Sequence, residues 1–373
     1  MTAITRPLAL CMTLAAASVL LLAGCASPTV ATPAPVVAVT SSPPDLRLAI
    51  SDEMLAELLD AALPGCSAAV AVHGQIVWAQ ALGVADLATG EPLTTTTRFD
   101  IASLTKQFTA TAVLMLQREA KLSLSDPIGS YVTGLPTTVR SITLDALMHH
   151  TSRIPDYWKK LGEWGYGFET PATQADALKA IRAVSKLSTT VGYEYSNSNY
   201  VLLAEVIATV SGQPYEQFVQ QRLLQPLGLS MQIDPVLQAP DIAVSYDDLN
   251  APTRNAWAFY GAFGTFATPT QLALWGDQYR DGDLIGNDFV TGAVDSGKPG
   301  EATEGRVYAA GMNINADGSL RHDGRMGGFI SAIKISPDRE TTVVVMCNGH
   351  LADRSGLVNG LWKIWVDDDP GGD

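Results

Sequence analysis

Strand-like segments stand at the two ends of the folded part of this chain, and helix-like segments fill the region between them. Near the start, "CSAAVAV" and "QIVWAQALGV" flank the His73-Gly74 turn and predict a β-hairpin. From Val307 onward, further segments predict strands: "VYAAGMNI", "SLRHDG", "GFISAIKIS" and "TTVVVMCN". One sheet built from both ends leaves the intervening helices as an inserted all-helical lobe, at about residues 108–250. The predicted fold class is therefore α+β.

Three helices can be recognised from the sequence. Ser51 is the predicted N-cap of the first helix, which ends at Pro64-Gly65. The clearest helix is "NYVLLAEVIATVSG", in which apolar residues repeat at helical spacing and Gly212 is the expected stop. A last amphipathic helix precedes an acidic tail and carries Leu357, Leu361, Ile364 and Trp365.

The first 44 residues are not part of the predicted fold. The apolar run from Leu8 to Ala23 is typical of a secretory signal peptide, assigned to residues 1–24. The "LAGC" that follows resembles the bacterial lipoprotein processing box, which implies cleavage before Cys25 and a lipid on its thiol. A plain signal peptide that happens to contain a cysteine is the alternative. Residues 25–44 are rich in proline, threonine and serine and predict an extended tether to a folded domain at 45–369.

These N-terminal features predict an exported protein that is anchored by lipid to a bacterial membrane, on the periplasmic side or at the cell surface. The formal net charge of −14 argues against a nucleic-acid partner, which requires a basic face, and against electrostatic docking on anionic lipid. His149 and His150 are adjacent, but no cluster of His, Cys or Asp with metal-ligand spacing accompanies them. We therefore predict neither a metal nor another cofactor.

A candidate nucleophile lies in "IASLTKQFTA", residues 101–110. On a helix, Ser103 and Lys106 would share one face, with the hydroxyl beside the ammonium group. A serine hydroxyl is a weak nucleophile until a base takes its proton, and Lys106 can be or tune that base if its pKa falls from about 10.4. Serine is also common at helix starts. A second such quartet, "SAIK" at 331–334, lies in a strand pattern that points its two ends to opposite faces.

Two further motifs follow in chain order: "YEYSNSNY", with Tyr195 and Asn197, and "RHDGRMGGF", with His322 and Gly324. With the Ser-x-x-Lys quartet, they resemble the signatures of the penicillin-recognising serine hydrolases, of the class C β-lactamase, DD-peptidase and esterase type. The resemblance runs from about Ala49 to His350 and includes "LMHHTSRIPDY" and "GAFGTFATP". It implies an antiparallel sheet flanked by helices, of the β-lactamase/transpeptidase kind, and catalysis through an acyl-enzyme without a cofactor.

The resemblance also implies a role for each residue. Ser103 is the expected nucleophile, Lys106 its base, and Tyr195 the group that relays the proton to the leaving group. Asn197 would hold Lys106 and a substrate carbonyl. Backbone N–H groups of Ser103 and Arg325 would form the oxyanion hole, worth roughly 3 kcal/mol per donor.

Two positions depart from the family pattern. Arg153 stands where glycine is usual, so the turn there is expected to take another shape. His322 stands where true β-lactamases carry lysine, and an unperturbed histidine, with a pKa near 6.5, is mostly neutral at pH 7.5. We therefore expect hydrolysis of an amide or ester, such as a D-amino-acid peptide or a small ester, with slow β-lactam turnover. An authentic class C-like β-lactamase and a non-catalytic lipoprotein that binds peptidoglycan or a protein partner are the alternatives.

Cysteine usage leaves two thiols in the folded domain. Cys11 would leave with the signal peptide and Cys25 would carry the lipid, so Cys66 and Cys347 remain in a chain whose destination permits disulfides. In the sheet of the family that the chain resembles, the first strand lies antiparallel beside the last, which would bring these two residues face to face. A disulfide and a pair of buried free thiols are both open at this point.

Overall fold

The computed structural model describes residues 45–282, 284, 301–302, 306–350 and 352–367. The predicted signal peptide, the lipidation site at Cys25, the tether and residues 368–369 of the predicted domain lie outside the described residues. None of the helices in the described ranges is long and apolar enough to cross a membrane.

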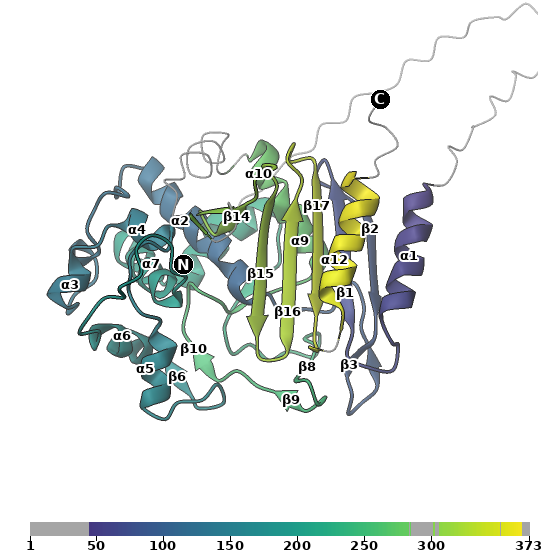
Figure 1. Cartoon of the computed structure of the whole chain (residues 1–373), viewed down its shortest axis with the longest axis horizontal. Coiled ribbons are helices and arrows are strands. Elements are labelled where there is room, and N and C mark those ends of the chain that lie inside the picture. The colour runs from purple at the N-terminus through teal and green to yellow at the C-terminus, as the bar shows by residue number, and fades with distance from the viewer. Residues whose placement is uncertain (1–44, 283, 285–300, 303–305, 351, 368–373) are drawn as a thin grey trace, which may run out of the picture. The chain divides into compact units, whose positions relative to one another are not determined.

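An antiparallel sheet occupies the centre of the described structure (Figure 1). Its strand order is β12-β13-β14-β15-β16-β17-β1-β2, so the N-terminal hairpin pairs with the last strand of the chain. This arrangement confirms the predicted sheet built from both chain ends. The strands are β1 (Cys66–Val72), β2 (Gln75–Leu82), β12 (Glu301–Ala302), β13 (Arg306–Ala309), β14 (Met312–Ile314), β15 (Leu320–Met326), β16 (Phe329–Ile335) and β17 (Thr341–Cys347).

Helices cover both faces of this sheet. The helices α1 (Leu46–Leu58) and α12 (Arg354–Trp362) pack on one face, and α9 (Pro269–Gly276) packs on the other. Alternate residues of β17 enter two separate apolar cores: Val343 and Val345 face α12, whereas Val344 faces the helical lobe. Because both faces are covered, every residue of β17 is buried.

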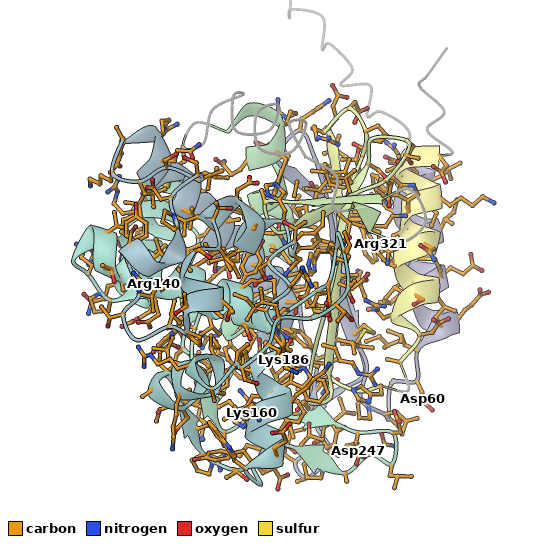
Figure 2. The ribbon with its side chains drawn as sticks, turned by 60° about the vertical axis from the view of Figure 1, so that its left-hand side comes forward. Asp60, Arg140, Lys160, Lys186, Asp247 and Arg321 are labelled. Carbon is orange, nitrogen blue, oxygen red and sulfur yellow. A yellow bond between two sulfur atoms is a disulfide. The ribbon has the colours of Figure 1, made fainter. Side chains whose placement is uncertain are left out.

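The helical lobe lies between β2 and β12 in the chain and beside the sheet in space (Figure 1). Packed side chains fill the region between the lobe and the sheet (Figure 2). Its clearest predicted helix is confirmed as α7, which ends at Gly212 in the left-handed conformation (φ +69°). The helices of this region are α2 (Lys106–Arg118), α3 (Thr137–Arg140), α4 (Leu144–Met148), α5 (Tyr157–Glu163), α6 (Gln174–Arg182), α7 (Asn197–Ser211), α8 (Tyr215–Val219) and α10 (Gln278–Asp281).

Short strands interrupt the lobe and its flanks, so the predicted all-helical character is only partly correct. Three of them, β5, β11 and β7, form a small sheet beneath the nucleophile turn that is described below. The short strands are β3 (Val84–Asp86), β4 (Glu91–Pro92), β5 (Phe99–Asp100), β6 (Ala172–Thr173), β7 (Gln232–Ile233), β8 (Ser245–Tyr246), β9 (Pro252–Thr253), β10 (Trp257–Ala258) and β11 (Thr265–Ala267).

Local predictions are wrong at both ends of the first helix and in one strand. The first helix begins at Leu46 with Asp45 as its N-cap and ends at Leu58, before Pro64-Gly65, and Ser51 lies buried inside it. The Ser51 hydroxyl instead accepts a hydrogen bond from Trp365 Nε1 at 3.0 Å, so a tertiary contact uses the group that suggested a cap. The single strand predicted in "VYAAGMNI" is split into β13 and β14 by left-handed backbone at Ala310 and Gly311 (φ +50° and +84°).

The two cysteines of the domain form a disulfide. Cys66 and Cys347 are directly opposite each other in the β1–β17 register, and their sulfurs are bonded. The bridge lies in the apolar core between the sheet and the helices α1 and α12. It joins residues that are 281 positions apart in sequence, and so closes a loop of nearly the whole domain.

Candidate active site

Ser103 is presented by a strained turn that leads into α2. It lies on a short 3-10 helix (Ala102–Thr105), and Ala102 before it has left-handed backbone (φ +50°). Such a conformation costs on the order of 1–3 kcal/mol in a non-glycine residue, so the surroundings must hold it. The buried carboxyl of Asp100 accepts the Ala102 N–H at 2.8 Å, and Ser331 Oγ donates to the carbonyl of Ile101 at 2.9 Å. The small sheet and β16 therefore fix the turn from two sides.

Lys106 lies one turn further along, fully buried beneath Ser103. Its Nζ is 3.1 Å from Ser103 Oγ, 2.8 Å from Asn197 Oδ1 and 2.9 Å from the carbonyl oxygen of Ala262. Burial lowers the pKa of Lys106 to about 7, against the opposing effect of the Asp156 carboxyl, which favours the charged form. Lysine therefore exchanges its proton here near neutral pH, which an exposed lysine does not do.

Tyr195 completes a compact group around the Ser103 hydroxyl. Its phenolic O–H donates to Ser103 Oγ at 2.9 Å, and Lys106 Nζ lies 4.9 Å from the centre of its ring. Burial raises the pKa of Tyr195 above its ordinary value. The phenol therefore keeps its proton at neutral pH and acts as a donor toward Ser103.

Asn197 is oriented by a carboxyl group that the sequence did not reveal. Asp156 Oδ2 accepts hydrogen bonds from the Asn197 backbone N–H at 2.8 Å and from its Nδ2 at 2.9 Å. Asn197 Oδ1 is thereby turned toward Lys106. The bond to Asp156 uses one of the two N–H donors of Nδ2, so the expected contact of the other with a substrate carbonyl stays a prediction. The sequence did carry a sign that could have drawn attention to Asp156: it is the N-cap of α5, and aspartate is a preferred residue at that position.

The His-x-Gly triplet lies on β15, directly against the nucleophile turn. A Cβ at Gly324 would stand 2.3 Å from Ser331 Oγ and 2.4 Å from the carbonyl oxygen of Ile101, so only glycine fits. A two-residue turn joins β15 to β16, which makes Met326 and Phe329 its hydrogen-bonded closing pair. By the alternation of an antiparallel ladder, the Arg325 N–H points away from β16, toward the free edge of β15.

His322 is buried, and both of its ring nitrogens have protein partners. Nδ1 must donate to the carbonyl oxygen of Asp323 (2.7 Å), so Nε2 is the acceptor for the Tyr308 hydroxyl (3.0 Å). Burial, with the nearby Lys106, lowers the pKa of His322 to about 4. The expectation of an unperturbed histidine is therefore wrong, because the sequence does not show how deeply this strand position is buried.

A cleft of about 860 Å³ opens over Ser103. Tyr195 and the triplet form one part of its wall, and the segment around His350 and Arg354 forms another. Asn197 and Lys106 are not among the residues that line this cleft. The lining residues are Ser103, Tyr193, Tyr195, Asn313, His322, Asp323, Gly324, Arg325, Ile330, His350, Ala352, Asp353, Arg354 and Ser355.

Two other sequence predictions can be compared with the structure. Arg153 has left-handed backbone (φ +63°), so the turn keeps the conformation that favours glycine instead of taking another shape. The quartet at 331–334 lies on β16, as predicted. Ser331 bonds to the nucleophile turn, whereas Lys334 Nζ lies 3.9 Å from the Trp362 ring of α12, so the two side chains do not meet.

Metal ligands do not gather anywhere in the described part of the chain: no group of three or more His, Cys, Asp or Glu side chains could hold an ion there. His150 is instead surrounded by aromatic rings, with its ring centre 4.3 Å from that of Tyr195 and 4.6 Å from that of Tyr308. Its Nδ1 accepts from Asn199 Nδ2 at 3.0 Å.

Comparisons with known proteins agree with this geometry. The family model described as Beta-lactamase matches residues 51–360. The putative penicillin-binding protein PbpX of Bacillus subtilis (strain 168) is 28% identical over 303 residues, which cover 79% of this chain and 73% of that protein.

Solved structures share the fold at lower sequence identity. The octameric penicillin-binding protein homologue from Pyrococcus abyssi has a TM-score of 0.72 at 24% identity, with 86% of this chain and 76% of that chain covered. The D-amino acid amidase from Ochrobactrum anthropi SV3 has a TM-score of 0.69 at 21% identity, with 84% and 98% covered. Because the family match spans most of the sequence, the chain belongs to the β-lactamase family and is a serine hydrolase of that family.

Proposed function

We propose that this protein cleaves esters or amides through an acyl-enzyme on Ser103, with Lys106 as the base that activates it. The contacts of Lys106 carry this proposal. A neutral lysine has two N–H donors and one lone pair, and its two acceptor-only partners are Asn197 Oδ1 and the carbonyl oxygen of Ala262. The lone pair is then left for the Ser103 hydroxyl, 3.1 Å away.

The proton can be followed through one acylation. Ser103 Oγ attacks the substrate carbonyl, its proton passes to Lys106, and the oxyanion is bound by the N–H groups of Ser103 and Arg325. Tyr195 gives its phenolic proton to the departing oxygen or nitrogen as the bond to the carbonyl carbon breaks. The proton held on Lys106 then restores the phenol. Water releases the acyl group by the same transfers in reverse.

The substrate class that we propose is a small ester or a D-amino-acid peptide, with slow turnover of β-lactams. His322 supports this choice because it is neutral near pH 7 and bonded to protein at both nitrogens, so it offers no positive charge to a substrate carboxylate. The nucleophilic group is intact, which argues against a role in binding alone.

The site of action that we propose is the outer side of a bacterial membrane, through a lipid on Cys25. The "LAGC" sequence and the uncharged tether after it support this proposal. Full-length protein expressed in a bacterium should sediment with membranes, and Cys25→Ser should abolish labelling by a radioactive fatty acid. Labelling that survives this substitution would remove Cys25 as the lipid site.

Covalent labelling tests the catalytic proposal directly. Protein without residues 1–44 should form an adduct with a fluorophosphonate probe, located on Ser103 by mass spectrometry. Ser103→Ala should abolish the adduct while leaving the circular dichroism spectrum unchanged. Ser125→Ala is the matched control, because that serine is exposed, lies outside the cleft over Ser103 and should leave labelling at Ser103 intact. An adduct that persists in Ser103→Ala would contradict the mechanism.

A further inference from the structure

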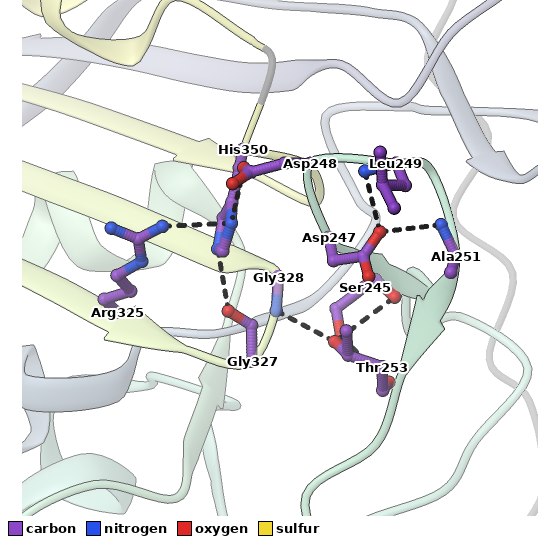
Figure 3. A network of polar contacts seen from close by, with 10 residues as sticks. All are labelled: Ser245, Asp247, Asp248, Leu249, Ala251, Thr253, Arg325, Gly327, Gly328 and His350. Atoms are coloured by element: carbon purple, nitrogen blue, oxygen red, sulfur yellow. Dashed lines mark hydrogen bonds and ion pairs between the residues drawn. The ribbon is translucent and has the colours of Figure 1, made fainter.

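The rim of the active-site cleft carries one arginine that is not neutralised by a carboxylate. Arg354 Nη1 pairs with Asp323 Oδ1 at 2.5 Å. Arg325 is exposed, and within the described part of the chain it forms no salt bridge; its Nη2 lies 3.0 Å from Nδ1 of His350. Figure 3 shows this pair beside Asp248, whose Oδ1 is also 3.0 Å from His350 Nδ1.

The contacts with Arg325 and with Asp248 require opposite protonation states of His350 Nδ1. His350 Nε2 lies 2.8 Å from the carbonyl oxygen of Gly327, which can only accept, so Nε2 carries a hydrogen and Nδ1 is the atom that gains or loses a proton. Unprotonated Nδ1 accepts from Arg325 and cannot donate to Asp248. Protonated Nδ1 donates to Asp248 and cannot accept from Arg325, whose positive charge it also repels.

The surrounding structure holds Asp248 in place for this contact. Asp248 lies in the turn between β8 and β9, and the Gly328 N–H donates to Thr253 Oγ1 at 2.9 Å, which fixes that turn to the β15–β16 hairpin (Figure 3). The neighbouring Asp247 stabilises the turn itself, since its Oδ1 accepts hydrogen bonds from the N–H groups of Leu249 and Ala251 at 2.8 and 2.9 Å.

Other charged groups near His350 have partners of their own. On α12, Asp353 caps the helix by accepting the Gly356 N–H at 2.8 Å, and Arg354 is paired with Asp323. From β15 the facing group is Arg325, and from the β8–β9 turn it is Asp248. The exchange at Nδ1 therefore involves these two side chains.

We propose that His350 is a proton-controlled switch that releases Arg325 to bind a carboxylate on the substrate. The proposal rests on the function proposed above and names a substrate class for it: esters or amides that carry a carboxylate near the scissile carbonyl. Histidine changes charge between pH 5 and 8. Mildly acidic conditions therefore favour anionic substrates at this site, and alkaline conditions remove the preference.

Paired substrates test the switch without interference from the catalytic base. One pair has the carboxylate on the acyl group: mono-p-nitrophenyl succinate and its methyl ester. The other has it on the leaving group: 3-acetoxybenzoate and its methyl ester. The ratio of kcat/KM, anionic over neutral, cancels the titration of Lys106. In at least one pair it should rise about fivefold from pH 8 to pH 5.5, the upper effect of an exposed ion pair.

Three variants assign the effect to its residues. Arg325→Gln removes the cation and His350→Gln removes the titrating ring, so each should make the ratio independent of pH. Asp248→Asn removes the negative charge that favours protonated Nδ1 and should move the rise to lower pH. His73→Gln is the matched control, because His73 is an exposed histidine on the distant β1–β2 turn, and it should keep the rise unchanged. A ratio that is flat in the unmodified protein for both pairs, or a rise that persists in His350→Gln, would overturn the proposal.

Histidine spectra give a readout that does not need turnover. Long-range ¹H–¹⁵N spectra of the imidazole rings, with His350→Gln for assignment, should show Nε2 protonated at pH 8 and Nδ1 gaining its proton as the pH falls. A ring that carries its hydrogen on Nδ1 at pH 8 would contradict the switch. If neither ester is cleaved and no adduct forms at Ser103, the proposed function is wrong, and these spectra alone decide the switch.

Discussion

Asp156 Oδ2 accepts both the backbone N–H and the Nδ2 of Asn197, so one carboxyl group fixes the amide that faces Lys106. Asp156 also favours the charged form of Lys106. Replacing Asp156 with asparagine should therefore let the pKa of Lys106 fall further. The acidic limb of the pH–rate profile should move to lower pH, measured as kcat/KM for p-nitrophenyl acetate between pH 5 and 9.

A matched control separates this effect from a general change of charge. Asp234→Asn removes one carboxylate outside the contacts of Lys106 and should leave the limb in place. A limb that stays unmoved in Asp156→Asn would mean that the carboxyl group does not act on the base.

The pKa of Lys106 also predicts how the acylation rate of the unmodified protein depends on pH. Lys106 must be unprotonated to accept the Ser103 proton, and burial lowers its pKa to about 7. Its active form is therefore scarce below that pH and dominant above it. Acylation by p-nitrophenyl acetate should rise about tenfold per pH unit well below pH 7 and level off above it. Stopped-flow measurement of the nitrophenol burst checks this, and acylation that is already maximal at pH 5 would exclude Lys106 as the base.

Lys106 and Tyr195 should act as one unit, since both contact the Ser103 hydroxyl. Lys106→Ala and Tyr195→Phe should each slow acylation by roughly 10²–10⁴-fold. The double variant should be little slower than the worse of the two, because groups that act together lose their effect together. Losses that multiply in the double variant would show two independent contributions.

Local patterns predicted much of this structure because they depend on neighbouring residues. The β1–β2 hairpin and the end of α7 at Gly212 follow from alternation and turn chemistry, and the structure has both. The Ser103–Lys106 pair was predicted from its spacing within one turn, although the turn is 3-10 at Ser103.

Features that depend on distant contacts could not be predicted in this way. Asp156 lies 41 residues from Asn197, and the depth at which His322 is buried depends on Tyr308 packing beside it. Ser51 showed the same limit, because its hydroxyl serves Trp365 at the far end of the chain. A pattern can identify a residue type that suits a role, but the partner that fixes its charge or orientation is set by tertiary packing.

The disulfide predicts a stability effect without a loss of catalysis. Cys66 and Cys347 lie 281 positions apart, and in the chain-entropy model a cross-link that closes so long a loop contributes roughly 5–6 kcal/mol to the free energy of unfolding. Cys66→Ala with Cys347→Ala should lower that free energy, measured by urea unfolding. The bridge lies in the core beneath α1 and α12, away from Ser103, so ester hydrolysis at 25 °C should persist. Two alkylatable thiols in the unfolded, unreduced protein would mean that the bridge is absent.

The last prediction concerns the charge of His322 between pH 6 and pH 8. The sequence alone left open that a charged His322 holds a substrate carboxylate, in which case cephalosporin acylation would fall from pH 6 to pH 8. Burial lowers its pKa to about 4, so the ring is neutral across that range. His322→Asn should therefore change the rate with a chromogenic cephalosporin by the same factor at pH 6 and pH 8. A factor that differs between the two would show that His322 titrates in that range. A kcat/KM on the order of 10⁶ M⁻¹s⁻¹ in the unmodified protein, typical of efficient enzymes, would make β-lactams the preferred substrates instead.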